Sequence, residues 1–395
     1  MKQVFQLISF LLRSFLCCLC GKSCKLHLPA KEHKKAATHT VRQGRFTKTA
    51  DGTYTNGKTA NTAQILLLGD LLCQRKQQNA YRKEDGGFDF TPMLAPMEEM
   101  FRSADLTVGN LECICDDTLA FMHEQTTADG LPFLNAPEEF LHALKNAGVD
   151  AVCSANNHNC DGGKQGILQT LARLREAELP VTGIFENENE KRYLMFNVNG
   201  IHIALLAYSA FYNFKSTSLS PAQRQTMLNL YRTKKAKQDI ENAKRNGADF
   251  VIVYMHWGTE YTHRVSWRQR RMAKRLTNCG CDLIAGSHPH VLQAFEYVNG
   301  VPCLYSFGNF ISSQTKDGTQ ESVLLQITLQ KENGKTVIAD LCAIPCKTSV
   351  SENDTQHRAE PVSKKDDAIT HANITDAIGN KIRITEWKRG CKKTA

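Results

Sequence analysis

Short apolar runs that each end in polar residues recur along this chain, and helical patterns lie between them. The run at 65–68 is followed by Gly-Asp, and the run at 250–255 is followed by His-Trp-Gly. Continuous apolar runs of this length are typical of strands buried on both faces. Strands that alternate with helices form parallel sheets through right-handed crossovers. The pattern therefore predicts an α/β fold whose mostly parallel strands end at one shared edge.

The same patterns predict the remaining elements. Helical spacing of apolar residues indicates helices at 92–103, 137–147, 163–174, 226–246 and 266–279. Strands are predicted at 106–108, 150–154, 192–198, 201–208, 281–285, 300–305, 322–330 and 335–345. Residues 213–225 are predicted to be a loop, and 381–387 a short strand.

Composition divides the chain into four segments. Residues 1–24 are apolar and are predicted to be a signal peptide or membrane anchor, or alternatively an amphipathic or disordered leader. Residues 25–60 are polar and basic, which favours a flexible linker. The strand and helix patterns fall in residues 61–348, which are predicted to be one domain. Residues 349–395 are predicted to be a polar, mostly disordered tail.

Charge and cysteine content bear on location and partners. The leader predicts a membrane-associated or exported protein. Basic residues are denser after the leader than before it, which opposes export of the body. Fifteen cysteines without a disulfide or zinc spacing also leave a cytoplasmic location open. Much of the net charge of +9 lies near the two ends, and no basic patch alternates with aromatic residues, so we expect no nucleic-acid partner.

Polar side chains follow the predicted strands at the points where they end. Taken alone, each is typical of a helix cap, a turn or a satisfied loop residue. Because parallel strands share one edge for their carboxyl ends, these side chains are expected to meet there. The set consists of Asp70, Asn110, Glu112, Asn157, His158, His256, His288 and His290.

This combination of residue types indicates metal-assisted hydrolysis. Imidazole and carboxylate ligands suit manganese, iron and zinc. Two such ions side by side can clamp an in-line displacement at phosphorus, and a further histidine can protonate the leaving oxygen. The sequence therefore predicts two divalent metal ions (Mn, Fe or Zn) at this edge of the sheet.

Several motifs resemble those of the CapA family, the poly-γ-glutamate capsule synthesis proteins of the calcineurin-like metallophosphoesterase superfamily. They are Ala-Asp-Leu to Asn-Leu-Glu at 104–112, Ala-Asn-Asn-His with Asp161 and Gly163, His-Trp-Gly-Thr-Glu-Tyr at 256–261, Gly-Ser-His-Pro-His at 286–290, and Tyr-Ser-Phe-Gly-Asn-Phe at 305–310. The resemblance covers roughly residues 63–315. It implies a four-layer α/β/β/α sandwich of the metallophosphoesterase type.

The resemblance also implies a role for each site residue. His158 would be the catalytic histidine. The metal ligands would be Asp70 and His290 for the first ion, Asn157, His256 and His288 for the second, and Glu112, or failing that Asn110, as the bridge.

Four further residues of these motifs have two readings each. Glu260 is a candidate metal ligand or a residue that orients one, with a plain surface acid as the alternative. Asn309 is a candidate metal ligand or a residue that orients a loop of the site, with a plain turn residue as the alternative. Trp257 and Tyr261 would line a substrate groove or pack at the strand edge.

Two positions depart from the pattern of the superfamily. The usual Asp-x-His after the first strand is Asp70-Leu71-Leu72 here, so one ligand is missing. The usual Gly-Asp after the second strand is Gly109-Asn110, with an acid displaced to Glu112. These departures leave metal occupancy and ordinary phosphatase activity open.

The expected function is that of a metal-dependent, phosphoesterase-like hydrolase in the synthesis of a poly-γ-glutamate capsule or surface polymer. Its substrate would be an anionic polymer or a phosphoester, and capsule-synthesis membrane proteins would be its partners. One alternative is a non-catalytic component of capsule polymer assembly or export that keeps the fold. Another is hydrolysis of amide bonds in a γ-glutamyl polymer.

Overall fold

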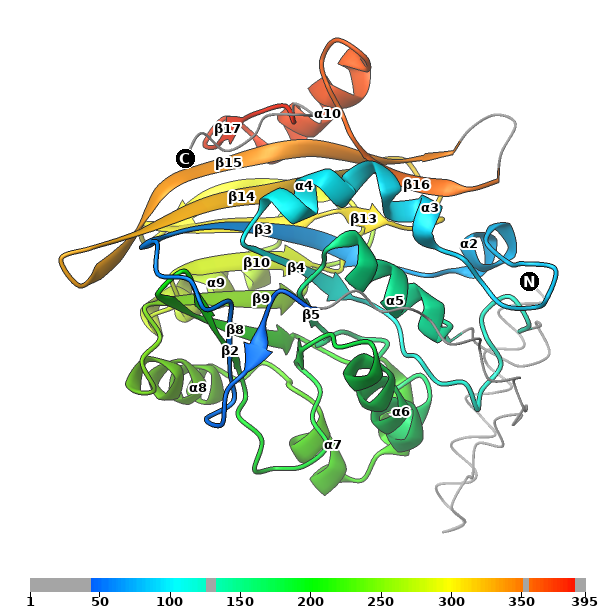
Figure 1. The fold of residues 1–395 in the computed structure, drawn as a ribbon, viewed down its shortest axis with the longest axis horizontal. Coiled ribbons are helices and arrows are strands. Elements are labelled where there is room, and N and C mark those ends of the chain that lie inside the picture. Colours follow the sequence, from blue (N-terminus) through cyan, green and yellow to red (C-terminus); the bar gives the residue numbers. More distant parts are fainter. Residues whose placement is uncertain (1–43, 126–132, 351–354, 388–395) are drawn as a thin grey trace.

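The structure is a computed structural model that describes residues 44–125, 133–350 and 355–387 (Figure 1). The predicted leader at 1–24 lies outside the described residues. Within those ranges, the helices are all too short or too polar to cross a membrane.

The first sheet is built around the apolar run at 65–68. Its order is β16-β15-β14-β3-β4-β5-β6, in which β3 to β6 are parallel and β14 to β16 are antiparallel to their neighbours. Two short strands, β13 and β17, pair with β3 and β15. The strands are β3 (Thr62–Leu71), β4 (Leu106–Leu111), β5 (Ala151–Cys153), β6 (Val181–Thr182), β13 (Asn309–Ile311), β14 (Glu321–Glu332), β15 (Lys335–Val350), β16 (His357–Pro361) and β17 (Arg383–Ile384).

The second sheet has the order β1-β2-β7-β8-β9-β10-β12-β11. Its centre, β8 to β10 with β12, is parallel, and the hairpin of β7 and β8 turns at Asn199-Gly200 as the sequence predicts. The strands are β1 (Thr47–Lys48), β2 (Thr53–Thr55), β7 (Leu194–Val198), β8 (Ile201–Ser209), β9 (Phe250–His256), β10 (Leu283–Ser287), β11 (Leu292–Val298) and β12 (Val301–Phe307).

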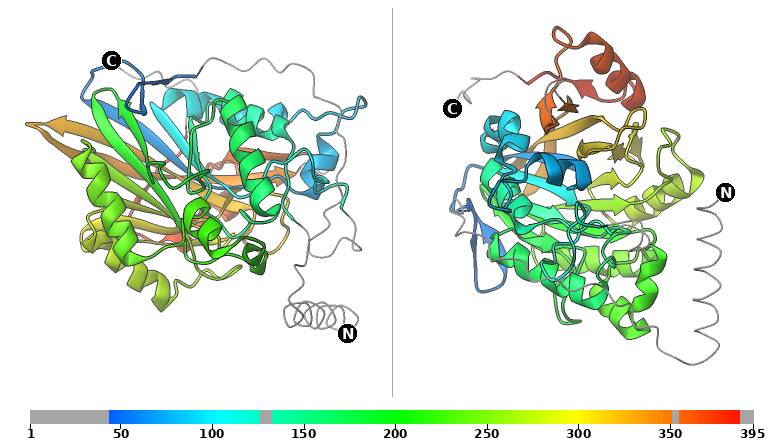
Figure 2. Two further views of the ribbon diagram at one scale, coloured as in Figure 1. Left: turned by 90° about the horizontal axis from the view of Figure 1, so that it is seen from below. Right: turned by 90° about the vertical axis from the view of Figure 1, so that its right-hand side faces the viewer.

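Helices cover the outer faces of the two sheets (Figures 1 and 2). Those longer than seven residues are α5, α6, α8, α9 and α10, and the others are single turns or little more. The helices are α2 (Arg75–Ala80), α3 (Thr91–Leu94), η1 (Ala95–Met97), α4 (Glu98–Ser103), α5 (Glu138–Ala147), α6 (Gly163–Glu176), η3 (Phe214–Ser218), α7 (Pro221–Met227), α8 (Thr233–Arg245), α9 (Trp267–Asn278) and α10 (Ala368–Ile378).

Three large apolar cores hold these layers together, and two smaller clusters lie beside them. Side chains of β3 alternate, so that Ile65 and Leu67 enter the core between the sheets, whereas Leu66 and Leu68 enter the core beneath α3 to α5. A third core lies between the second sheet and the helices α8 and α9, where Ile240 is fully buried. The predicted four-layer α/β/β/α sandwich is therefore confirmed.

The two sheets are joined where their strands end. At Gly308 the chain leaves β12 in the second sheet and enters β13 in the first. A Cβ atom at Gly69 would lie 2.2 Å from the carbonyl oxygen of Gly308, so only glycine fits there. The Tyr254 hydroxyl of the second sheet donates a hydrogen bond to the Val108 carbonyl of the first, at 3.0 Å.

The fold is wider than the predicted domain at 61–348. The linker prediction for 25–60 is wrong for the described residues, because β1 and β2 extend the second sheet beside β7. Arg45 anchors this segment by an ion pair with the buried Asp150. A basic composition does not reveal that one arginine has a buried carboxylate as its partner.

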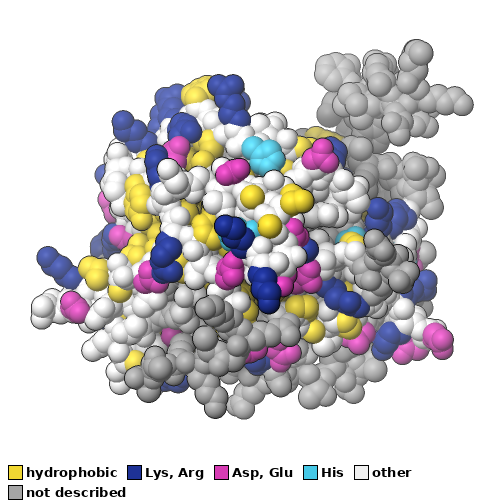
Figure 3. Space-filling model, turned by 90° about the horizontal axis from the view of Figure 1, so that it is seen from above, with side chains coloured by type: hydrophobic (Ala, Val, Ile, Leu, Met, Phe, Trp, Pro, Cys, Tyr) yellow, Lys and Arg dark blue, Asp and Glu magenta, His cyan; other side chains and the backbone are white. Residues whose placement is uncertain are grey.

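The tail prediction for 349–395 is also wrong for the described residues, since β16, α10 and β17 lie within it. Ile374 and Ile378 of α10 are fully buried in the core between the sheets. The apolar residues of α10 stand within a polar, mixed-charge segment, where their spacing gave too weak a signal. On this side of the molecule, basic and acidic side chains are interspersed with apolar ones (Figure 3).

Two smaller predictions need correction. The predicted loop at 213–225 contains η3 and most of α7, whose N-cap Ser220 forms a capping box with Gln223. The predicted helix at 92–103 is divided into α3, η1 and α4, with Pro96 near the start of η1.

We predict that α10 contributes to the stability of the fold. Ile374→Ala should lower the free energy of unfolding by about 2–5 kcal/mol, because it leaves a cavity in the core between the sheets. Urea unfolding followed by circular dichroism measures the change. Ile369→Ala on the same helix is the matched control, since Ile369 is 77% exposed and its loss should cost less than about 0.5 kcal/mol. Equal stability of both variants and the parent would show that α10 does not belong to the core.

Candidate metal centre

The predicted site residues meet at the carboxyl ends of strands from both sheets. Asp70 and Glu112 come from β3 and the end of β4, and the imidazoles come from β9 and from the turn after β10. All of the predicted ligands are at most 4% exposed. They are Asp70, Glu112, Asn157, His256, His288 and His290.

The turn after β10 is held in an unusual backbone conformation. Gly286 allows β10 to lie close to β12, because a Cβ there would be 2.0 Å from the Tyr305 carbonyl oxygen. His288 and His290 have φ angles of 95° and 60°, and Pro289 stands between them. Residues with side chains seldom adopt positive φ, and such conformations cluster at functional sites. Here the strained turn directs both imidazoles into the site.

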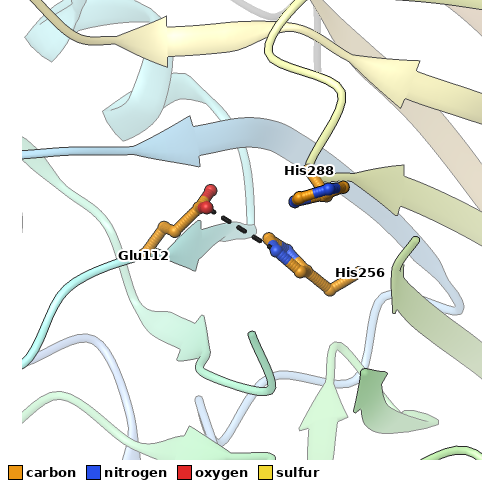
Figure 4. A group of neighbouring side chains, drawn as sticks. All are labelled: Glu112, His256 and His288. Atoms are coloured by element: carbon orange, nitrogen blue, oxygen red, sulfur yellow. Dashed lines mark ion pairs between the residues drawn. The ribbon is translucent and has the colours of Figure 1, made fainter. Parts of the chain in front are cut away.

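The carboxylate of Glu112 points towards the imidazoles of His256 and His288 (Figure 4). Its carboxylate is fully buried, and neither oxygen has a hydrogen-bond partner. The nearest ring nitrogens are Nε2 of His256 at 3.6 Å and Nε2 of His290 at 3.8 Å from Oε1. Burial raises the pKa of Glu112 well above its usual range, although the charge of His290 acts against this.

Glu112 belongs to two groups of potential ligands. Its carboxylate lies with His256 and His288 in one group, and with Asp70 and His290 in the other. Within each group, one ligand atom per residue lies within 4.8 Å of the others. This arrangement places Glu112 between two potential cation positions.

The protonation states of His256 and His288 fit a cation site, whereas Glu112 and Asp70 outweigh burial and raise the pKa of His290 to about 9. Burial, together with the neighbouring His290, lowers the pKa of His288 to about 3. Burial and the neighbouring imidazoles also lower the pKa of His256 well below its usual range. Both rings are therefore neutral and able to donate a lone pair. Nδ1 of His288 is buried without a hydrogen-bond partner, so a buried acid and a buried base both lack partners that a divalent ion would supply.

Hydrogen bonds fix the orientation of most of these groups. Asn110 donates to Asp70 Oδ1 at 2.8 Å, and the backbone N–H of His288 donates to Oδ2 at 3.2 Å. His290 Nδ1 bonds Asn309 Oδ1 at 2.9 Å. Asn110 therefore holds Asp70 rather than lying between the two groups, and Asn309 orients an imidazole.

His256 is fixed at both ring nitrogens. Nε2 lies 2.8 Å from Asn157 Oδ1, and Nδ1 lies 3.1 Å from Ser287 Oγ. Because Asn157 Oδ1 can only accept, Nε2 carries the proton of the neutral ring here and Nδ1 accepts from the hydroxyl. A cation bound at Nε2 would take the place of that proton. Asn157 thus contacts the ring of His256, as expected if both residues bind the same ion.

His158 lies at the more open side of the cluster, with a side chain that is 18% exposed. Its Nδ1 bonds Asp161 Oδ2 at 2.9 Å. Asp161 also pairs with Lys215, whose Nζ is 3.3 Å from Oδ1. Burial raises the pKa of Asp161, but His158 and Lys215 outweigh it, so the pKa is lowered and the carboxylate stays charged.

The two predicted substrate residues have different surroundings. Trp257 is fully buried, stacks on Tyr305 and donates from Nε1 to the Tyr305 carbonyl at 2.9 Å. The prediction that Trp257 lines a substrate groove is wrong, because its ring belongs to the core beneath α8 and α9. Tyr261 is half-buried, with its ring centroid 5.9 Å from that of His290. The carboxylate of Glu260 is exposed and lies near His288 and His290.

Sequence reasoning missed several residues of the site. Asp161 and Ser287 stand within the motifs, three residues after His158 and directly before His288, and their spacing was the available signal. Phe211, whose ring centroid is 4.8 Å from that of His288, gave no signal. The same holds for Asn213, which accepts a hydrogen bond from Asn157, because neither residue follows a periodic pattern.

Comparisons with known proteins agree with the motifs. Residues 64–314 match the family model described as bacterial capsule synthesis protein PGA_cap. The capsule biosynthesis protein CapA of Bacillus anthracis is 30% identical over 280 residues, which cover 69% of this chain and 65% of that protein. The PGA biosynthesis protein CapA of Bacillus subtilis is 32% identical over 273 residues, 67% of each chain.

A solved structure is also similar to this chain. The calcineurin-like phosphoesterase YfkN from Bacillus subtilis is 16% identical, with a TM-score of 0.46, and the match covers 79% of this chain and 97% of that chain.

We predict that divalent ions stabilise the fold through Glu112. Manganese at 100 times its dissociation constant should raise the free energy of unfolding of the metal-free protein by about 2.7 kcal/mol. A 100-fold weaker affinity in Glu112→Gln would reduce that gain to about 0.4 kcal/mol at the same concentration. Thermal or urea unfolding with and without MnCl2 measures both values.

Glu241→Gln is the matched control for this experiment, because Glu241 lies on the outer helix α8 with a side chain 54% exposed. It should keep the full gain. An equal gain in the Glu112 variant would argue against a cation beside this carboxylate.

Proposed function

The chain belongs to the bacterial capsule synthesis protein family PGA_cap, and on this premise we propose that it is a metal-dependent, phosphoesterase-like hydrolase of surface polymer synthesis. The polymer would be a poly-γ-glutamate capsule or a related material. The observation that carries the proposal is the buried carboxylate of Glu112, which has no hydrogen bond and lies among imidazoles. An apolar residue would avoid the cost of burying that group, so packing alone does not explain it.

The ligands of two divalent ions (Mn, Fe or Zn) would be those gathered at the strand ends. Such ions, when bound, supply Lewis-acid stabilisation of charge at a phosphoryl group and lower the pKa of water. The group of Asp70, Glu112 and His290 would hold one ion. The group of Glu112, His256 and His288, with Asn157, would hold the other.

His158 would act as the general acid. Its Nδ1 is occupied by the charged Asp161, which fixes the plane of the ring. Its Nε2 has no hydrogen-bond partner among the described residues. A partly exposed imidazole held in this way can give a proton to the leaving oxygen of a substrate. Asp161 is a positioning residue in this scheme, and Lys215 helps to keep it charged.

Two lysines near the histidines support an anionic substrate, either a phosphoester or an acidic polymer. Lys215 lies beside the pair of His158 and Asp161. Lys316 lies with its Nζ 3.4 Å from the ring centroid of Tyr261. Positive charges at these places would attract an anion towards the metal ligands.

A second candidate is a non-catalytic component of capsule polymer assembly or export. It is favoured by the replacement of one expected ligand by Leu72, which is 1% exposed and lies in the core beneath the helices. The group around Asp70 then has few protein ligands. A protein of this kind would keep the fold and bind the polymer without turnover. In either case we propose that the apolar residues 1–24 associate the protein with the membrane or direct its export. Its partners would then be capsule-synthesis membrane proteins.

We predict metal-dependent turnover that requires His158. The metal-free full chain should hydrolyse p-nitrophenyl phosphate or bis(p-nitrophenyl) phosphate only after manganese is added. His158→Ala should lower kcat by about 10²–10⁴-fold, because it removes the general acid, and should leave the bound metal unchanged. Absorbance at 405 nm and elemental analysis measure the two properties.

Lys274→Ala is a suitable control, because this exposed residue of α9 lies outside the site and its loss should not change turnover. Bound metal without turnover in the parent, together with a His158→Ala variant that still supports capsule formation, would favour the non-catalytic candidate. Absence of both metal and turnover would overturn the enzymatic proposal.

A further inference from the structure

Glu260 lies at the solvent side of the imidazole pair. It belongs to the segment that follows β9, and its side chain is exposed, unlike those of the other candidate ligands. One of its carboxylate oxygens nevertheless lies within 4.8 Å of ring nitrogens of His288 and His290. Glu260 is therefore close to one histidine of each potential cation position.

Backbone hydrogen bonds fix this segment against the histidine turn. The N–H of Trp257 donates to the Ser287 carbonyl at 3.1 Å, and the N–H of Tyr261 donates to the Pro289 carbonyl at 2.8 Å. Tyr261 has a φ of 60°, which is unusual for a residue with a side chain. The strained backbone and these two bonds hold Glu260 at a constant place relative to His288 and His290.

The Tyr261 side chain lies beside the carboxylate. Burial and the nearby charge of Glu260 raise the pKa of Tyr261 to about 12, so the phenol stays protonated. Lys316 lies over the same ring, with Nζ 3.4 Å from its centroid. Glu260 therefore adjoins a neutral phenol at the solvent side of the two histidines.

The metal centre lacks a ligand that Glu260 can supply. Leu72 points into the core beneath the helices and contributes nothing to the site. Nδ1 of His288 is buried and has no hydrogen-bond partner, although it belongs to the imidazole pair that Glu260 faces. Two buried carboxylates alone leave two divalent ions with an excess positive charge, and a third carboxylate would reduce it.

We propose that Glu260 is a metal ligand that completes the centre from its solvent side and compensates for the ligand missing at Leu72. This inference rests on the metal centre of the proposed function. It gives the centre one exposed ligand among otherwise buried ones. Tyr261 then acts as a positioning residue for that ligand, rather than as a wall of a substrate groove.

Metal binding by the full chain tests the proposal without any substrate. The metal-free protein, Glu260→Gln and the control Glu241→Gln are titrated with MnCl2 and with ZnCl2 in a calorimeter. Glu260→Gln should lose one of two bound ions, or at least about tenfold in affinity for one of them. The melting temperature of the metal-free variant should equal that of the parent, because Glu260 is exposed.

Cobalt spectra distinguish a ligand from a nearby charge. In Co²⁺-loaded protein, loss of a carboxylate ligand should change the visible absorption bands, whereas loss of a distant charge should not. A weaker affinity with unchanged bands would therefore overturn the ligand role of Glu260, as would an unchanged affinity. A parent protein that binds neither Mn²⁺ nor Zn²⁺ would overturn the metal centre itself and this inference with it.

Discussion

The close contact of two backbones at Gly69 and Gly308 is the constraint on which the site depends. It joins the two sheets at the ends of their strands, where the Asp70 N–H donates to the Gly308 carbonyl at 3.2 Å. The carboxylates of the site come from the first sheet, and His256, His288 and His290 come from the second. Neither sheet alone carries a complete set of ligands. Any side chain at Gly69 would press against the Gly308 carbonyl and so separate the acids from the imidazoles.

Around this junction several residues depart from ordinary backbone and polar-group preferences. Glu112 is buried without a hydrogen bond, and His288, His290 and Tyr261 all have positive φ angles. Elsewhere apolar side chains alternate between cores and α7 has a capping box, although five further non-glycine residues outside the site also have positive φ. The gathering of three strained residues and an unpaired buried carboxylate in one place, within a well-packed surrounding, is typical of a functional site. The cost of the site is thus offset by the packing of four layers.

The sequence predicted the central elements of the fold well. Strands such as 65–68 and 250–255 are uninterrupted apolar runs, and such runs are typical of central strands that are buried on both faces. The shared edge of parallel strands predicted that Asp70 and Glu112 would lie near each other, and likewise the histidines. It did not predict that the two groups come from different sheets. The edges of the fold were harder to predict. The segment around Arg45 is attached by an ion pair with the buried Asp150 and by strand pairing with β7, and α10 is attached by a few apolar side chains. Composition does not reveal these contacts.

Within the site, the residue types could be predicted from the sequence, but the directions of their side chains could not. Trp257 stands in a motif full of site residues, yet its ring turns into the core because it occupies the opposite face of the strand from His256. Asn110 and Asn309 were candidate ligands, and in the structure they hold Asp70 and His290. Such supporting roles depend on the three-dimensional distance between residues far apart in the chain. No spacing along the sequence encodes the contact of Phe211 with His288.

The position of β3 has a consequence for how the protein is made. This strand is among the first elements of the fold to leave the ribosome, yet its Leu67 pairs with Leu325 of β14, and α10 closes the core beside it. One edge of β3 pairs with β4 early, but its other edge has no partner until β14 has been synthesised. Contacts between residues so distant in the chain slow folding and leave strand edges open to wrong pairing. The first sheet can therefore be completed only late in synthesis, and its folding is expected to be slow.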